Sequence, residues 1–98
     1  MLNIKQAIAL ISKVCPAWAD AAVSCCEEND DYFYVSVVAE SSLESDFPIG
    51  NFFRCAKSDG MVESHGTSPF YDQYDGCKPC REIAAPTDGA IRPLKRTA

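Results

Sequence analysis

Two cysteines near the end of the chain have a spacing that permits chemistry. Cys77 and Cys80 are separated by Lys78 and Pro79, so both sulfurs can meet in one disulfide or on one metal ion. A thioredoxin-like pair would lie between an early strand and a long helix, whereas this pair follows the last predicted strand. A zinc site needs further ligands, and the remaining candidates are Cys55, His65 and the adjacent Cys25 and Cys26. No second Cys-x-x-Cys completes such a set, so the sequence predicts no cofactor and leaves a redox or zinc role for this pair as an alternative.

His65, the single histidine of the chain, has no neighbouring residues in the sequence that would support catalysis. His65 ends a predicted strand, and general-base work requires a nucleophile and an orienting group beside it. Ser64 and Ser68 are near in sequence, but neither lies in a nucleophile motif. The chain also lacks a phosphate-binding glycine loop and the His-Glu-x-x-His motif. We therefore predict no catalytic residue and expect that the protein is not an enzyme.

Acidic residues and tyrosines form a second kind of constellation, which points to binding. They comprise a first acidic cluster, the two tyrosines that follow it, and a second acidic cluster: Glu27, Glu28, Asp30 and Asp31, then Tyr32 and Tyr34, then Glu40, Glu44 and Asp46. Such clusters are often ordinary solvated loops. Beside exposed tyrosines they can instead enter a basic cleft, because opposite fields speed association and aromatic anchors hold the complex. We take these residues as the candidate partner-binding site.

The overall charge limits the class of partner. Residues 1–91 carry 14 acidic and 6 basic side chains, a net charge of −8, and Arg92, Lys95 and Arg96 bring the chain to −5. An acidic domain repels phosphate backbones and anionic lipid, so we expect neither nucleic acid nor a membrane as partner. The longest apolar runs are far shorter than the ~20 residues of a membrane span. Without a secretory signal at the start, we expect a cytoplasmic protein with reduced thiols.

One helix is predicted at the start of the chain. Asn3 is a good N-cap, and Gln6 three residues later can return a bond to its backbone amide. Pro16 ends or kinks the helix because it has no amide proton and disfavours a helical conformation in the residue before it. The apolar stripe recurs at three- and four-residue spacing and consists of Leu2, Ile4, Ala7, Ile8, Ile11, Val14 and Cys15.

Strand patterns follow the helix. They are rich in β-branched and aromatic residues and span residues 21–26, 32–38, 49–57 and 61–65. The first two are predicted to form a hairpin, in which Phe33, Val35 and Val37 face the helix while Tyr32 and Tyr34 lie on the half-exposed face. The last two are joined by a tight turn.

These elements predict an α+β fold with a four-stranded antiparallel sheet, one N-terminal helix packed on one face, and a short C-terminal helical turn over residues 70–75. Apolar periodicity is lost after Ile83. We therefore expect a single domain over residues 1–84 and a flexible basic tail over residues 85–98.

Turn and strand motifs in this order resemble a known family. The aromatic pair Tyr32-Phe33 opens the second strand. In the closing hairpin, Asp59-Gly60 forms the turn and Val62-Glu63-Ser64 is an apolar-acidic-polar strand. The pair Gly66-Thr67 and then Pro69 follow this strand. Over about residues 4–75 the chain resembles the immunity protein 35 family of small bacterial domains that protect against polymorphic toxins. Tyr32 stands where that family has tryptophan, and the Cys77 to Cys80 segment has no counterpart in it.

The resemblance implies a bacterial immunity or antitoxin-like inhibitor. We expect a small cytoplasmic protein-binding domain that occludes a basic toxin or enzyme with its acidic clusters and tyrosines. One alternative is a thiol-dependent redox or zinc-binding protein that uses Cys77 and Cys80. Another is a structural homodimer joined through an exposed sheet face or an edge strand.

Overall fold

The N-terminal helix forms as its capping residues predict. The computed structural model describes residues 1–70 and 78–95, and its first element is α1 (Ile4–Ser12). The Gln6 amide donates to Asn3 Oδ1 at 2.8 Å, and the Asn3 amide donates to Gln6 Oε1 at 2.9 Å. This capping box satisfies two amides that the helix start leaves open. The helix ends at Ser12, so Val14 and Cys15 of the predicted apolar stripe lie beyond the last helical residue. The Val14 side chain is exposed.

Within residues 1–70 and 78–95 the sheet has five strands, all antiparallel to their neighbours, in the order β4-β3-β2-β1-β5. Their bounds are β1 (Ala21–Glu28), β2 (Tyr32–Ala39), β3 (Gly50–Ala56), β4 (Val62–Ser64) and β5 (Arg81–Glu82). The α+β class and the antiparallel sheet are confirmed, but the prediction of four strands is wrong. The fifth strand pairs its two residues with Glu27 and Glu28 of β1. A strand of two residues has no measurable periodicity, so the sequence pattern cannot reveal it.

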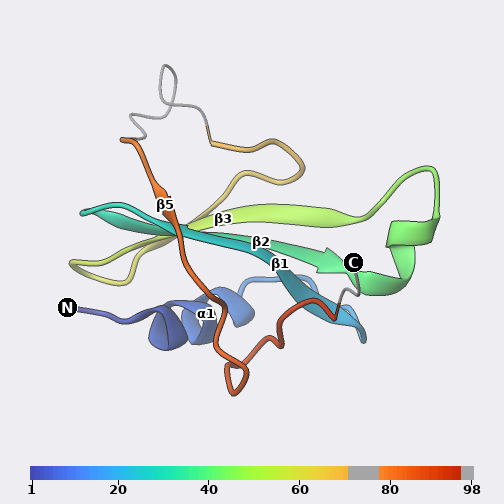
Figure 1. Ribbon diagram of the computed structural model, residues 1–98, viewed down its shortest axis with the longest axis horizontal. Helices are drawn as coiled ribbons and strands as arrows, with labels where there is room; N and C mark the ends of the chain where they lie inside the picture. Colours follow the sequence, from blue (N-terminus) through green and yellow to red (C-terminus); the bar gives the residue numbers. More distant parts are fainter. Residues whose placement is uncertain (71–77, 96–98) are drawn as a thin grey trace.

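The core lies between α1 and one face of the sheet (Figure 1). Phe33, Val35 and Val37 of β2 are buried there with Ile8 and Ile11 of α1, as the alternation of the strand predicts. Pairing of β2 with β3 adds further core residues to the same face, because directly opposed residues share a face: Phe53 lies opposite Val35, and Cys55 lies opposite Phe33. We call the opposite face, which carries Tyr32 and Tyr34, the outer face.

Tight connections join the strands. Gly60, in the turn before β4, has a φ of 75°, a left-handed conformation that glycine adopts without a steric penalty. The loop after β2, which carries the second acidic cluster, contains a short 3-10 helix, η1 (Glu40–Glu44). Within the described residues, no helix is long and apolar enough to cross a membrane.

A flexible tail was expected over residues 85–98, but the described part of it, residues 85–95, packs against the sheet. Ile91 is only 6% exposed and belongs to the core cluster. The Val23 amide donates to the Arg92 carbonyl at 2.8 Å, and the Leu94 amide donates to the Val23 carbonyl at 2.9 Å. In Figure 1 the chain runs from β5 past α1 and returns to the beginning of β1, where Val23 lies. A single apolar anchor sets no period, so the sequence pattern misses this packing.

The predicted C-terminal helical turn spans residues 70–75, and all of it after Phe70 falls within residues 71–77. These residues lie outside the part of the chain that the structure describes. Phe70, which directly precedes them, is not in a helix. The segment from His65 to Phe70 lies on the outer face, where its rings contact those of β2.

Candidate functional site

A row of side chains crosses the whole outer face, with one residue from each strand. Strand register places Glu63 opposite Arg54, Arg54 opposite Tyr34, Tyr34 opposite Glu27, and Glu27 opposite Glu82. Directly opposed residues of antiparallel strands lie on the same face and contact each other. Tyr34 therefore lies in the middle of the row. On one side of it Arg54 forms an ion pair with Glu63. On the other side lie the two carboxylates of Glu27 and Glu82.

Arg54 is the most buried charged group of this face, at 9% exposed. Its Nη2 lies 2.9 Å from Glu63 Oε2, and its guanidinium carbon lies 4.4 Å from the Tyr32 ring centroid and 4.9 Å from that of Phe70. Burial disfavours the charged form, but the hydrogen bonds that the guanidinium donates to Glu63 and Tyr34 outweigh it, so the pKa of Arg54 lies above its ordinary value. The guanidinium is thus held charged between two aromatic rings.

The rings around Arg54 contact one another. Tyr32 and Tyr34 have ring centroids 5.9 Å apart, and Tyr34 meets the edge of Phe70 at 5.5 Å with an interplanar angle of 70°. His65 stacks on Phe70 at 3.9 Å and 15°. These contacts fix the side chains in place, since edge-to-face and offset aromatic pairs are favourable arrangements. We call Tyr32, Tyr34, Arg54, His65 and Phe70 the aromatic cluster.

A hollow of about 120 Å³ opens beside the aromatic cluster. We call it the outer hollow. Aromatic and apolar side chains form most of its wall, and Glu27 brings a carboxylate to it. Its lining from the described residues is Cys25, Glu27, Tyr34, Val35, Ser36, Phe52, Phe53, Pro69, Phe70 and Cys80.

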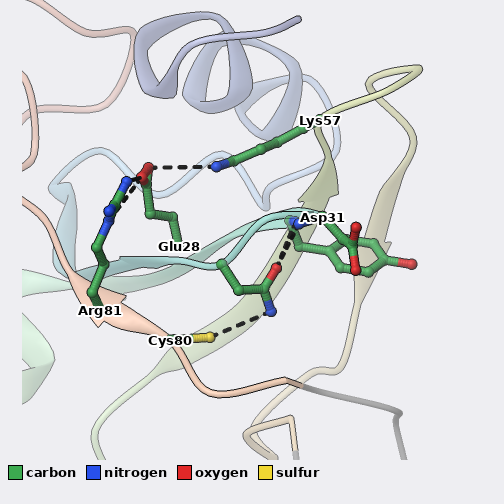
Figure 2. A network of polar contacts seen from close by, with 7 residues as sticks. Glu28, Asp31, Lys57, Cys80 and Arg81 are labelled. Atoms are coloured by element: carbon green, nitrogen blue, oxygen red, sulfur yellow. Dashed lines mark hydrogen bonds and ion pairs between the residues drawn. The ribbon is translucent and has the colours of Figure 1, made fainter.

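The first acidic cluster does not form one surface. Glu27 lies in the row on the outer face, whereas Glu28 pairs with Arg81 and Lys57 at the end of the core (Figure 2). The hydrogen bond from Arg81 and the nearby Lys57 charge hold the pKa of Glu28 below its usual range. Asp31 Oδ2 lies 2.8 Å from Lys78 Nζ, so it is paired as well. Alternation along β1 therefore turns one expected steering charge into a structural one.

The second acidic cluster lies at the other end of β2. That strand has eight residues, so its ends are about 25 Å apart. Glu40 pairs with Arg92 of the C-terminal segment, while Glu44 and Asp46 are exposed. One small contact cannot include both clusters together, so the candidate site predicted from the sequence is divided in two.

Several residues of this face escaped the sequence reasoning. Arg54 lies opposite Tyr34 and Phe52 opposite Ser36 through strand pairing, and chain reversal brings Phe70 onto Tyr34. Short-range sequence patterns do not contain these contacts. Phe47 is 86% exposed between the two exposed residues Asp46 and Pro48. The sequence shows Phe47 between an acidic residue and a proline, but it does not show that the phenylalanine side chain is exposed.

The candidate metal and redox residues lie apart. Cys55 is fully buried in the core beneath α1, whereas His65 stacks on Phe70 of the outer face. Cys80 accepts from Asn29 Nδ2 at 3.7 Å (Figure 2), and its expected partner Cys77 is outside the described residues. Among residues 1–70 and 78–95, no three His, Cys, Asp or Glu side chains gather as a metal site.

The thiols of β1 face opposite ways, as expected for neighbouring strand residues. Cys26 is buried, and a register shift between Val23 and Cys25 leaves Cys25 exposed at the outer hollow. Partial desolvation and the Glu27 carboxylate raise the pKa of Cys25, and burial raises the pKa of Cys26 to about 12. A nucleophilic or redox-active thiol needs the opposite shift, so neither group is activated.

Comparison of the chain with protein-family models, with curated proteins and with solved structures found no match in any of the three. The candidate site is therefore interpreted from its own geometry.

Proposed function

We propose that this chain is a small cytoplasmic protein-binding domain, which docks a basic protein partner on its outer face. We further propose that it inhibits that partner by covering its active-site cleft, as the resemblance to bacterial immunity proteins implies. The observation that carries the proposal is the aromatic cluster, in which Arg54 lies between Tyr32 and Phe70 on the face opposite α1.

The composition of this cluster favours binding. Tyrosine is enriched among the few residues that supply most of the energy of protein interfaces. Arg54 is itself buried and paired with Glu63, so it holds the rings in place rather than contacting a partner. The ring contacts also restrict the tyrosines, so little side-chain freedom is lost when a partner docks. The cluster thus has the chemistry and the rigidity of a preorganised anchor.

The charges around the cluster favour a basic partner. Glu27 and Glu82 form no ion pair with any basic side chain of the described residues, and the chain carries a net charge of −5. Opposite fields accelerate encounter and orient the partner before contact. Glu28, Asp31 and Glu40 contribute less than the sequence suggested, because basic residues of the chain itself already offset their charges.

Site-specific photocrosslinking in the native host tests the proposal. Thr67, which is exposed in the segment on the outer face, is replaced by p-benzoylphenylalanine, and the matched control carries the same residue in place of exposed Lys13 after α1. We expect a covalent adduct with a basic protein from position 67 and none from position 13. The protein recovered should then be inhibited by the purified chain and inhibited much less by a Tyr34→Ala variant.

Three results would contradict the proposal. An adduct from position 13 but not from position 67 would place the binding surface elsewhere. An adduct of twice the chain mass would show a homodimer in its place. A recovered partner whose activity is unchanged by the chain would exclude inhibition by occlusion.

A further inference from the structure

We propose that the outer hollow receives one lysine or arginine side chain of the partner, with its aliphatic stem against the aromatic wall and its charged head on Glu27 and Glu82. This inference rests on the proposed function and names the chemistry that the surface recognises.

The size of the hollow selects a single side chain. Sites for small molecules and cofactors typically span about 300–1,000 Å³, and the outer hollow has about 120 Å³. It is too small for a cofactor or a folded segment and suits one extended side chain. Tyr34, Phe52, Pro69 and Phe70 give it an apolar wall of the kind along which the methylene stems of lysine and arginine pack.

The carboxylates select a cation. Glu27 lines the hollow, and Glu82 lies directly opposite it in the pairing of β1 with β5. Like charges directly opposed across two strands destabilise the pair. Neither carboxylate has a basic partner within the described residues. An incoming cation relieves this repulsion, whereas a purely apolar side chain leaves the Glu27 carboxylate desolvated beside it.

Arg54, the buried cation that the described residues place on the outer face, does not compete for this position. Arg54 lies across Tyr34 from Glu27 in the row, and its charge is offset by Glu63 at 2.9 Å. Aromatic faces attract cations as well, so the ring of Tyr34 adds to the attraction of the carboxylates. The row therefore holds the Arg54 cation on one side of Tyr34 and accepts the lysine or arginine of the partner on the other side.

Titration of the isotopically labelled full chain with small probes tests this inference by NMR. One probe is N-acetyl-lysine methylamide, and the matched probe is N-acetyl-norleucine methylamide, which has the same stem without the charge. We expect saturable shifts at Cys25, Tyr34 and Phe52 with the lysine probe and binding weaker by about tenfold or more with norleucine, because a charge-assisted contact is lost.

Variants locate the cation. Glu27→Gln should weaken the lysine probe by about tenfold, Glu82→Gln should weaken it less, and Glu44→Gln at the far end of the sheet should leave it unchanged. Each variant is first compared with the parent by its amide spectrum, which keeps a loss of fold distinct from a loss of binding. Equal affinity for both probes, no saturable shift, or equal binding by Glu27→Gln would overturn the inference.

The crosslinking experiment separates this inference from the proposed function. If position 67 captures and inhibits a basic partner while the lysine probe does not bind, only the side-chain assignment is wrong. If the lysine probe binds as expected but position 67 captures nothing, the proposed function is wrong while the hollow remains a cation site.

Discussion

Glu28 and Lys57 meet at the end of the core, where Oε2 and Nζ lie 3.7 Å apart and each side chain is only 12% exposed. The Lys57 ammonium also lies 4.6 Å from the ring centroid of Phe33. On its other side the Glu28 carboxylate receives Arg81 of β5. This one carboxylate connects β1, β5 and the turn after β3, so a charge that the sequence suggested for partner recognition contributes to folding.

Acid should therefore destabilise the protein partly through Glu28. Its pKa in the folded chain lies below the usual 4.5 because of the Arg81 hydrogen bond first and the Lys57 charge next. A lowered carboxylate pKa stabilises the fold above the usual value, and that stabilisation is lost as pH falls through the lowered pKa. Urea unfolding at a series of pH values should show a smaller acid loss for Glu28→Gln than for the parent. Glu44→Gln, at an exposed site, should keep the parental slope, and identical slopes for all three would contradict this role.

The C-terminal segment should contribute measurably to stability. Ile91→Ala removes a core side chain and should lower the free energy of unfolding by about 2–5 kcal/mol. Lys95→Ala is the matched control, because that side chain is exposed and only its backbone amide contacts Glu40. Equilibrium denaturation measures both. An Ile91→Ala variant as stable as the control would restore the free tail that the sequence predicted.

The two faces of β2 should differ in their tolerance of truncation. Val35 is buried beneath α1, so Val35→Ala should cost about 1–3 kcal/mol. Ser36 lies on the outer face and accepts from Ser24 Oγ at 2.9 Å between exposed groups, so Ser36→Ala should cost under about 0.5 kcal/mol. Thermal or urea unfolding gives both values. The reverse order would show that the faces of the strand are exchanged.

The acidic residues and Tyr34 should affect different rates of partner binding. Glu27→Gln combined with Glu82→Gln should slow association with the crosslinked partner and flatten its salt dependence, since unpaired surface charges act at long range. Tyr34→Ala should chiefly speed dissociation and weaken binding by about 1–3 kcal/mol, because an aromatic anchor acts after docking. Rates measured at two salt concentrations test both effects.

The control for these rates is Glu44→Gln combined with Asp46→Asn, which neutralises acids at the other end of β2. Both rates should stay near those of the parent. Slower association in this control than in the Glu27 and Glu82 variant would assign the contact to the loop that carries Phe47.

Some sequence predictions were confirmed because the responsible interactions are local. The capping box joins residues three apart, the hairpin of β1 and β2 follows from two adjacent strand patterns, and Gly60 takes its positive φ within one turn. The two-residue β5 and the anchoring of Ile91 were missed. Each depends on a single pairing or burial with a distant part of the chain, and neither produces a repeating pattern.

The sequence by itself determined the α+β class, the helix, the hairpin and the inward face of β2, because capping and alternation act over a few residues. Only the tertiary structure decided which acidic residues form ion pairs within the fold. Arg81 reaches Glu28 across 53 positions and Arg92 reaches Glu40 across 52, whereas Glu27 and Glu82 are placed side by side on the outer face. The interaction between two charges depends on their separation in space and not on their separation along the chain. Glu27 and Glu28 are neighbours in β1 but point to opposite faces of the sheet, so Glu28 forms ion pairs while Glu27 lies beside Glu82.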